Sequence, residues 1–555
     1  MEQNNKKSKG FKIGIVVLVA AILGVGIFAA PKIVQAFRKM TMSPAEYYQY
    51  VETKNRDDSE AMVFGYYDTM RKSIAGDSYA KSVDIKAELS DTAKSLLETA
   101  GLDVTNVQNM EINMITGKEG TALSNQIKLR GNDQDLITVK SYTDSEEKEY
   151  YYQIPELSEG YLDMSAMYEG LETELSDTAK NRDGSTTVTV SRLGDVVDYE
   201  KLFMETDTLK ELYRRYTDIL IKSAKNVKRS EGGCKVEKVS QEADKYTVTL
   251  DGEEISKLIE EVLQELKNDK SIQKFLEELD ENTYQEFTKK LDELLKKLDS
   301  GKEQNELKAV EEVQISSDEE IIAREIVIEA DGEKVLGISY ALPRDGEKFA
   351  CHFAVTAEDD TKLFYIDGSG TFELGMLNGE MTLGMDDPVI EGEEAVTAIS
   401  LEKLLKLEFK DYDMSKFSEG EVKGTIVYST EALAELANYS IEVESQGNMQ
   451  EATGKITVFS GKEEYVSIDV TAKSDASLDG IKPSEDSVIY DRNNEEDMLQ
   501  YESEMDMEQL MTDIQEKLGV DFSALLDSFL MSAGEPADIE NLEEGSGITN
   551  IDEFE

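Results

Sequence analysis

The chain has 555 residues, and its 117 acidic residues far exceed its 59 basic ones, which gives a formal net charge of -58 at pH 7. A field of that sign repels nucleic acid, so we exclude nucleic acid as a partner. The sequence contains one histidine, two cysteines and no tryptophan. Histidine is the usual general base of nucleophilic catalysis, so this composition argues against an enzyme.

The first forty residues predict a membrane anchor. An uninterrupted apolar run extends from Ile13 to Ala30, and lysines lie on both sides of it. A membrane-spanning helix needs about 17 to 25 mostly apolar residues. We therefore predict a basic cytoplasmic stub at 1–12, a transmembrane signal-anchor at 13–36, and a single-pass protein of the cell membrane with its bulk extracytoplasmic. A cleaved signal peptide remains the alternative.

A first unit of strands and helices is predicted at residues 43–231. Ser43-Pro44-Ala45-Glu46 has the form of a capping box with proline at the first helical position, which predicts a helix from here to Met70. Alternating apolar residues then predict an antiparallel meander. Its strands are expected at Asn109 to Ile115, Leu123 to Leu129, Leu136 to Tyr142, Tyr150 to Ile154 and Thr186 to Val190. A further helix is expected at Val197 to Lys225.

A second unit with the same plan is predicted at residues 234–482. It carries a helical insert at 253–300, where apolar residues recur at helical spacing. Eleven strands and one helix, at Ala398 to Leu407, are expected after the insert. Asp-Gly pairs predict hairpin turns at Asp331-Gly332, Asp345-Gly346 and Asp367-Gly368.

The C-terminal part of the chain is predicted to be a helical segment at 483–531, followed by an acidic disordered tail at 532–555. The complete prediction is an α+β fold. It consists of an N-terminal transmembrane helix followed by two units of antiparallel β-sheet, each resembling an open half-barrel, with packed helices.

No group of residues predicts a catalytic, cofactor or metal site. His352 is the only histidine, and it lies in a predicted strand beside Cys351. Cys234 and Cys351 permit one disulfide, but strand cysteines are often plain buried hydrophobic residues, and that alternative is favoured. Calcium loops need oxygen ligands at fixed spacing around a glycine turn, and neither Asp411 to Asp413 nor Asp133 to Asp135 completes one. We expect no catalytic residue, no cofactor and no dedicated metal.

The string from Tyr150 to Leu157 places aromatic residues at the end of a predicted strand, followed by Pro155. These aromatics either line a concave apolar face or cover a helix. With the long strands and crossing helices, the Tyr152 to Leu157 segment resembles the open half-barrels of LolA- and LppX-type lipoprotein carriers. The whole chain also resembles acidic single-span ectodomain proteins of unknown function from clostridial Gram-positive bacteria.

The function expected from the sequence is a non-catalytic binding or scaffolding module at the bacterial cell surface. Its expected partners are the membrane, through a single span, and an unknown envelope protein, polymer or lipid. The alternative implied by the resemblance is a carrier of lipid or lipoprotein acyl chains in half-barrel cavities. An apolar concave face and a packed core follow the same sequence pattern, so the two functions remain open here.

Overall fold

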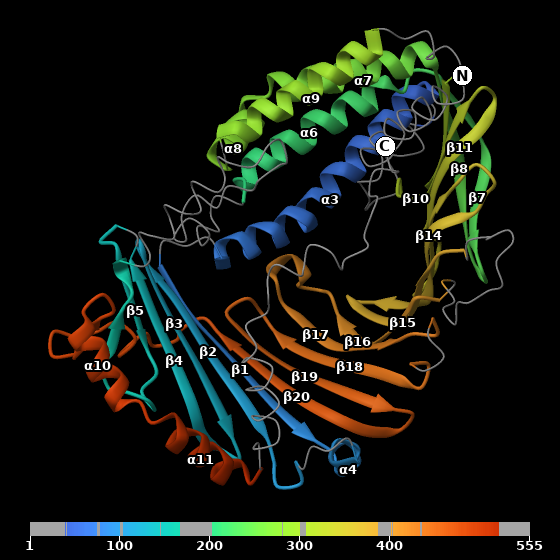
Figure 1. Ribbon diagram of the computed structural model, residues 1–555. Coiled ribbons are helices and arrows are strands. Elements are labelled where there is room, and N and C mark those ends of the chain that lie inside the picture. The colour runs from blue at the N-terminus through green and yellow to red at the C-terminus, as the bar shows by residue number, and fades with distance from the viewer. Residues whose placement is uncertain are drawn as a thin grey trace, which may run out of the picture.

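The protein is described by a computed structural model, which places residues 39, 42–74, 78–99, 104–144, 146–166, 203–279, 281–299, 307–386, 401, 403–432 and 436–520. Its dominant element is one long, curved β-sheet of 21 strands. A layer of five helices packs on the β8 to β10 end of this sheet and extends toward the β1 end, and three further helices lie beside its N-terminal strands and its C-terminal end (Figure 1).

The helices of the layer are α3 (Pro44–Ile74), α6 (Thr206–Ser223), α7 (Gly252–Asn268), α8 (Lys270–Leu279) and α9 (Glu281–Asp299). The three further helices are α4 (Asp91–Thr99), α10 (Glu495–Glu504) and α11 (Met507–Leu518). The strands are β1 (Ser78–Leu89), β2 (Met110–Glu119), β3 (Ala122–Gly131), β4 (Gln134–Asp144), β5 (Glu149–Gln153), β6 (Tyr161–Asp163), β7 (Val227–Val236), β8 (Val239–Asp251), β9 (Leu307–Ser316), β10 (Ile321–Ala330), β11 (Glu333–Ala341), β12 (Arg344–Asp345), β13 (Lys348–Thr356), β14 (Lys362–Glu373), β15 (Met376–Gly384), β16 (Leu405–Asp413), β17 (Val422–Ser429), β18 (Tyr439–Gly447), β19 (Glu451–Ser460), β20 (Glu463–Lys473) and β21 (Ile489–Asp491).

The strands do not follow chain order in space. Pairing runs from β7 through β11, β13 and onward to β20, and β20 then pairs antiparallel with β1. From β1 the sheet continues through β2 to β6 in antiparallel pairs. Strand β21 then pairs with β6 in parallel orientation. The pair between β20 and β1 joins the two predicted units. The expected fold class of two separate α+β units is therefore wrong, because both meanders belong to one mostly-β sheet.

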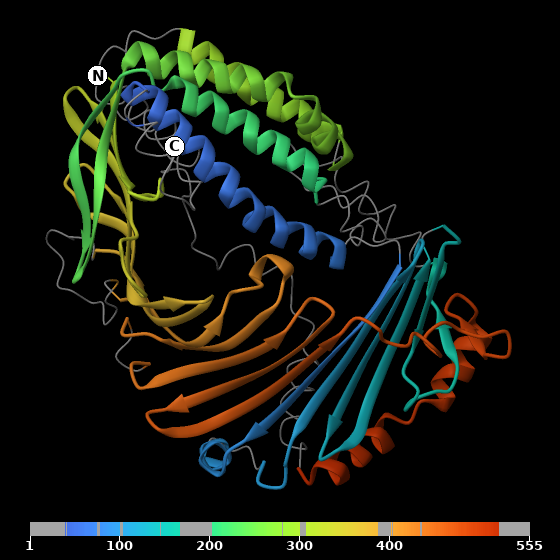
Figure 2. The ribbon, with the colours of Figure 1, turned by 180° about the vertical axis from the view of Figure 1, so that it is seen from behind.

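The helix α3 connects the predicted units a second time. Its capping box is present as predicted: the Ser43 N–H donates to Glu46 Oε2 at 2.8 Å, and the Glu46 N–H donates to Ser43 Oγ at 3.3 Å. Its buried face, however, packs on β8 to β10 and not on the strands that follow it in the chain. Figure 2 shows α3 crossing the molecule from the β10 end of the sheet toward the β1 end. The buried cluster comprises Tyr47, Tyr48, Val51, Ala224, Tyr246, Val248, Val313, Ile315 and Ile321.

Two local predictions are corrected. Asp367-Gly368 is not a hairpin turn but the middle of β14, where Gly368 pairs with Cys351 and Met381. A Cβ at Gly368 would come within 2.9 Å of Cys351 Sγ, so this glycine permits close packing between strands. The predicted helix at Ala398 to Leu407 is also wrong, because its last residues begin strand β16. Asp331-Gly332 is a turn as predicted, with positive φ at both residues.

The membrane prediction is corrected as well. Among the residues that the structure describes, no helix is long and apolar enough to cross a membrane. The predicted stub at 1–12, the anchor at 13–36 and the tail at 532–555 lie outside the described residues. The predictions of a single-span anchor, of the membrane as a partner through that span, and of a single-pass localisation in the cell membrane are therefore wrong.

Candidate binding surfaces

The two faces of the sheet can be followed from strand to strand, because residues paired across antiparallel strands project to the same side. One row of pairs begins under α3 and crosses eight strands through Tyr246, Val313, Arg324, Tyr340, Phe353, Ile366, Leu383 and Leu405. Four residues further along β16, Phe409 is on the same side as Leu405 and starts a second row. It continues through Ile426, Val443, Ile456, Ile468, Ala87 and Met110. We call this side the apolar face.

On β8 to β11 the apolar face is covered by helices and contains a buried charge network. The Arg324 guanidinium donates to both carboxylate oxygens of Glu52 on α3, at 2.6 and 2.8 Å, and also to Glu311 on β9. Tyr48 Oη donates to Glu311 at 2.9 Å. Burial raises the pKa of Glu52 and that of Tyr48. Burial alone would lower the pKa of Arg324, yet Glu52 and Glu311 raise it well above its ordinary value. This network ties α3 to the sheet.

On β16 to β20 and β1 to β3 the apolar face is open. We define the open apolar face by the side chains of Phe409, Ile426, Ile441, Val443, Ile456, Val458, Val466, Ile468, Val470, Ile85, Ile112 and Ile127. None of these described side chains is buried, and Ile441, Ile112 and Ile127 are exposed at 42%, 37% and 49%. At the far end, α11 packs its Leu518 near Met110 and Leu129. Apolar surface of this extent on one side of a sheet is typical of an interaction site.

The opposite side of the same strands carries charge. Its central row crosses nine strands through Lys410, Thr425, Glu444, Lys455, Asp469, Lys86, Glu111, Arg130 and Asp135. Apart from Thr425, positive and negative side chains alternate along it. We call it the charged row.

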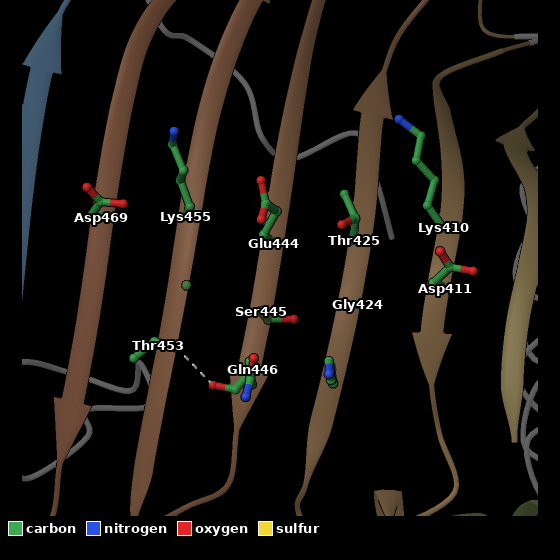
Figure 3. A pocket seen from close by; sticks show the side chains of 12 residues that line it. Lys410, Asp411, Gly424, Thr425, Glu444, Ser445, Gln446, Thr453, Lys455 and Asp469 are labelled. Carbon is green, nitrogen blue, oxygen red and sulfur yellow. Dashed lines mark hydrogen bonds between the residues drawn. The ribbon is translucent and has the colours of Figure 1, made fainter.

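A hollow of about 600 Å³ lies over the β16 to β20 part of the charged row. Figure 3 shows Asp469, Lys455, Glu444, Thr425 and Lys410 in order on five neighbouring strands. The remaining lining residues are Asp411, Lys423, Gly424, Ser445, Gln446, Thr453 and Gly454. Three lysines and three acidic residues line the hollow, so its charge is balanced in a chain that is strongly acidic overall.

The two ends of the charged row differ in how their charges are paired. At the β2 to β4 end, Arg130 contacts Glu111 and Asp135, each at 2.9 Å, and the Glu111 hydrogen bond raises the pKa of Arg130. In the hollow, Lys410 pairs with Glu442 at 3.1 Å. The side chains of Glu444, Lys455 and Asp469 make no ion pair within the described part of the chain. The hollow therefore exposes neighbouring charges that the fold does not neutralise.

The residues singled out in the sequence lie elsewhere. His352 Nδ1 is 2.5 Å from Asp367 Oδ1 on the neighbouring strand. Cys351 precedes it and projects to the other face, so thiol and imidazole do not form a catalytic pair. Cys234 and Cys351 are both free, and burial raises the pKa of each thiol to about 11.

Neither calcium candidate forms a site. In the described residues no group of three or more His, Cys, Asp or Glu side chains could hold a metal. Asp411 lines the hollow, and Asp413 accepts a hydrogen bond from the Ser415 N–H at 2.9 Å. Asp135 belongs to the paired end of the charged row, where it contacts Arg130 and Lys128.

The Tyr150 to Leu157 segment is a packing element in the structure. Tyr151 stacks on Tyr142, with ring centroids 6.3 Å apart, and Lys482 Nζ lies 4.6 Å from the centre of the Tyr142 ring. Glu156 Oε2 accepts the Thr138 N–H at 2.9 Å beside an irregular register in β4. The aromatics thus line no described cavity.

Comparison with known proteins adds little. No family model and no curated protein matches the chain. Among solved structures, OccK5 (OpdH) of Pseudomonas aeruginosa is similar at 8% identity over 72% of this chain and 96% of its own, with a TM-score of 0.17. OccK3 (OpdO) of the same organism is 7% identical over 74% of this chain and 98% of its own, with a TM-score of 0.15. Scores this low carry no argument about function, and the resemblance to lipoprotein carriers stays a prediction.

The charged row was not predicted from the sequence. Its members are spread from Lys86 to Asp469, and each lies in an ordinary alternating strand. The alternation of β18, where Glu442, Glu444 and Gln446 are separated by apolar or small residues, indicates a polar side of that strand. Only the register between strands brings the charges into one line.

Proposed function

We propose that this protein is a non-catalytic binding module that recognises a polar partner at the hollow over β16 to β20. The observation that carries the proposal is the set of uncompensated charges on Glu444, Lys455 and Asp469, on adjacent strands at a hollow of about 600 Å³. Charges of both signs at fixed spacing give specificity, because a partner with the wrong order of charges meets like charges.

The rest of the surface favours binding over catalysis. The His352 imidazole contacts the Asp367 carboxylate across the β13 to β14 pair. The neighbouring thiol of Cys351 projects to the other face of the sheet. General base and nucleophile must come within hydrogen-bond reach of each other, which this arrangement does not provide.

The test is to probe the full chain against an array of short peptides that carry acidic and basic residues in all orders, at low and high salt. The comparison protein carries Glu444→Ala, Lys455→Ala and Asp469→Ala together. These side chains make no ion pair in the described structure, so we expect the triple variant to fold. Salt-sensitive retention of particular charge orders by the wild type, lost in the variant, supports the proposal. Retention of no peptide, or equal retention by both proteins, overturns it.

A second candidate function is a carrier of acyl chains, and the open apolar face favours it. The rows that contain Ile441 and Val443 on β17 to β20 present apolar side chains with no charged residue among them. Neutral hydrocarbon is the ligand chemistry that such a surface fits.

The carrier is tested by comparing native and denatured masses of the full chain purified without detergent. A reproducible mass excess of lipid size, lost when Ile456 is changed to aspartate, supports it. A bare mass that stays unchanged after incubation with phospholipid vesicles overturns it. Leu363→Asp, at an exposed position of β14 outside the open apolar face, is the control for a general effect of one added charge.

A further inference from the structure

We infer that the partner at the hollow is an α-helix that crosses the strands and presents basic, acidic and basic side chains in that order to Asp469, Lys455 and Glu444. This inference rests on the proposed function and adds the conformation and the charge order of the partner. It follows from the spacing of the charged row and from the ion pairs that already occupy the β2 to β4 end of that row.

The spacing favours a helix over an extended peptide. Neighbouring strands are about 4.8 Å apart, so the three charged positions span about 9.6 Å across the sheet. A helix rises about 1.5 Å per residue, which places positions i, i+3 and i+7 on one side over about 10.5 Å. An extended strand places i, i+2 and i+4 on one side over about 13 Å. The helical spacing therefore matches the charged row and the extended spacing does not.

The row also specifies positions further along the partner. Thr425 is the next member after Glu444, and Lys410 follows it on β16. At helical spacing these two correspond to i+10 and i+14, over about 21 Å against the roughly 19 Å from β20 to β16. The partner should therefore carry an uncharged residue at i+10 and an acidic one at i+14. Because Lys410 already pairs with Glu442, this last contact contributes less than the first three.

The paired end of the row explains why the site is confined to the hollow. Glu111, Arg130 and Asp135 continue the same alternation but neutralise one another across β2 to β4. A helix lying there would have to break existing ion pairs, whereas at Glu444, Lys455 and Asp469 it only replaces water. The long-range field of a chain with net charge -58 further favours a partner that is basic overall.

The experiment measures the binding of labelled helical peptides to the full chain by fluorescence anisotropy. One peptide carries Lys, Glu, Lys, Ala and Glu at i, i+3, i+7, i+10 and i+14 on an alanine-rich background, and the second has every charge reversed. A third carries the first three charges at i, i+2 and i+4 and a proline that prevents helix formation. We expect the first peptide to bind at least about tenfold more tightly than either of the others.

Variants of the protein locate the contact. Lys455→Glu should abolish binding of the first peptide, and a peptide with lysine in place of its first glutamate should restore it. Lys86→Ala, one strand beyond the hollow on the same row, is the matched control and should leave binding unchanged. If the extended peptide binds as tightly as the first and Lys455→Glu still weakens it, the helix is wrong and the hollow remains the binding site. If the reversed peptide binds as tightly as the first, the inferred charge order is wrong. If no peptide binds, or if Lys455→Glu has no effect, the inference and the proposed function both fall.

Discussion

The sheet has two regions with the same sequence pattern and opposite environments. On β8 to β11, apolar side chains alternate with polar ones and are buried under α3 and α7; Val313 and Ile315 have no exposed surface. On β16 to β20 the alternation is the same, and connected rows of pairs put its apolar side chains on the same face. Here Ile441 is 42% exposed. Alternation therefore decides which side a residue occupies, while a covering helix decides whether that residue is buried.

The comparison extends to the charges. Arg324, Glu52 and Glu311 are buried between α3 and the sheet, and their hydrogen bonds satisfy one another. Glu444, Lys455 and Asp469 lie on the opposite face of the sheet, where they line the hollow. Buried charges are expected to affect stability, whereas exposed ones remain available for binding.

The largest expected effect comes from removing the centre of the buried network. Arg324→Met leaves Glu52 and Glu311 buried without their counter-charge, which we expect to cost about 3–5 kcal/mol of unfolding free energy at neutral pH. Urea denaturation measures it. The triple variant Arg324→Met, Glu52→Gln and Glu311→Gln should recover most of this loss. A loss below about 1 kcal/mol in the single variant would mean that water reaches the two carboxylates.

A matched pair of truncations tests the covered and open regions directly. Ile315→Ala removes a fully buried side chain under α3 and should cost about 2–5 kcal/mol. Ile441→Ala removes the same atoms from an exposed position of the open apolar face, where no cavity forms, and should cost less than about 1 kcal/mol. Denaturation midpoints of the two variants give the comparison. Equal losses would show that the face on β18 is covered in solution.

Alkaline pH should weaken the covered region first. Burial raises the pKa of Tyr48, Tyr246 and Tyr340, whereas these groups titrate near pH 10 in the unfolded chain. A raised folded pKa means that the contribution to stability is complete below about pH 10 and is lost as the pH rises through the folded value. The unfolding free energy should therefore be lower at about pH 11 than at about pH 9. Tyr340→Phe should reduce that slope, and an unchanged slope would contradict the assignment.

The smallest effect is expected in the hollow. Lys455→Ala removes a charge with no ion-pair partner in the described structure, so its unfolding free energy should stay within about 0.5 kcal/mol of the wild type. Arg130→Ala, on the same row, loses two partly exposed ion pairs and should cost up to about 1 kcal/mol. Thermal melting of both variants tests this order. A larger loss for Lys455→Ala would assign that lysine a structural role.

Local signals in the sequence predicted local structure. The capping box at Ser43 to Glu46 begins α3, and the turn at Asp331-Gly332 joins β10 to β11, because both depend only on neighbouring backbone groups. The same reasoning failed at Asp367-Gly368, where the glycine serves close packing against Cys351. It failed again at Leu405 to Leu407, where pairing with β15 overrides a helical apolar pattern.

The sequence alone determined the strongly acidic surface, the alternating strands and the helical insert, since composition and periodicity depend on the residues themselves. Tertiary structure alone decided that the strands form one sheet, that α3 covers β8 to β10 and leaves β16 to β20 open, and that Glu444, Lys455 and Asp469 stand in line. The single sheet depends on the β1 to β20 pair, which joins residues hundreds of positions apart, and the line of three charges depends on the register between β18, β19 and β20. No local pattern encodes such a pairing, because any alternating strand can pair with many others until the whole sheet selects one register.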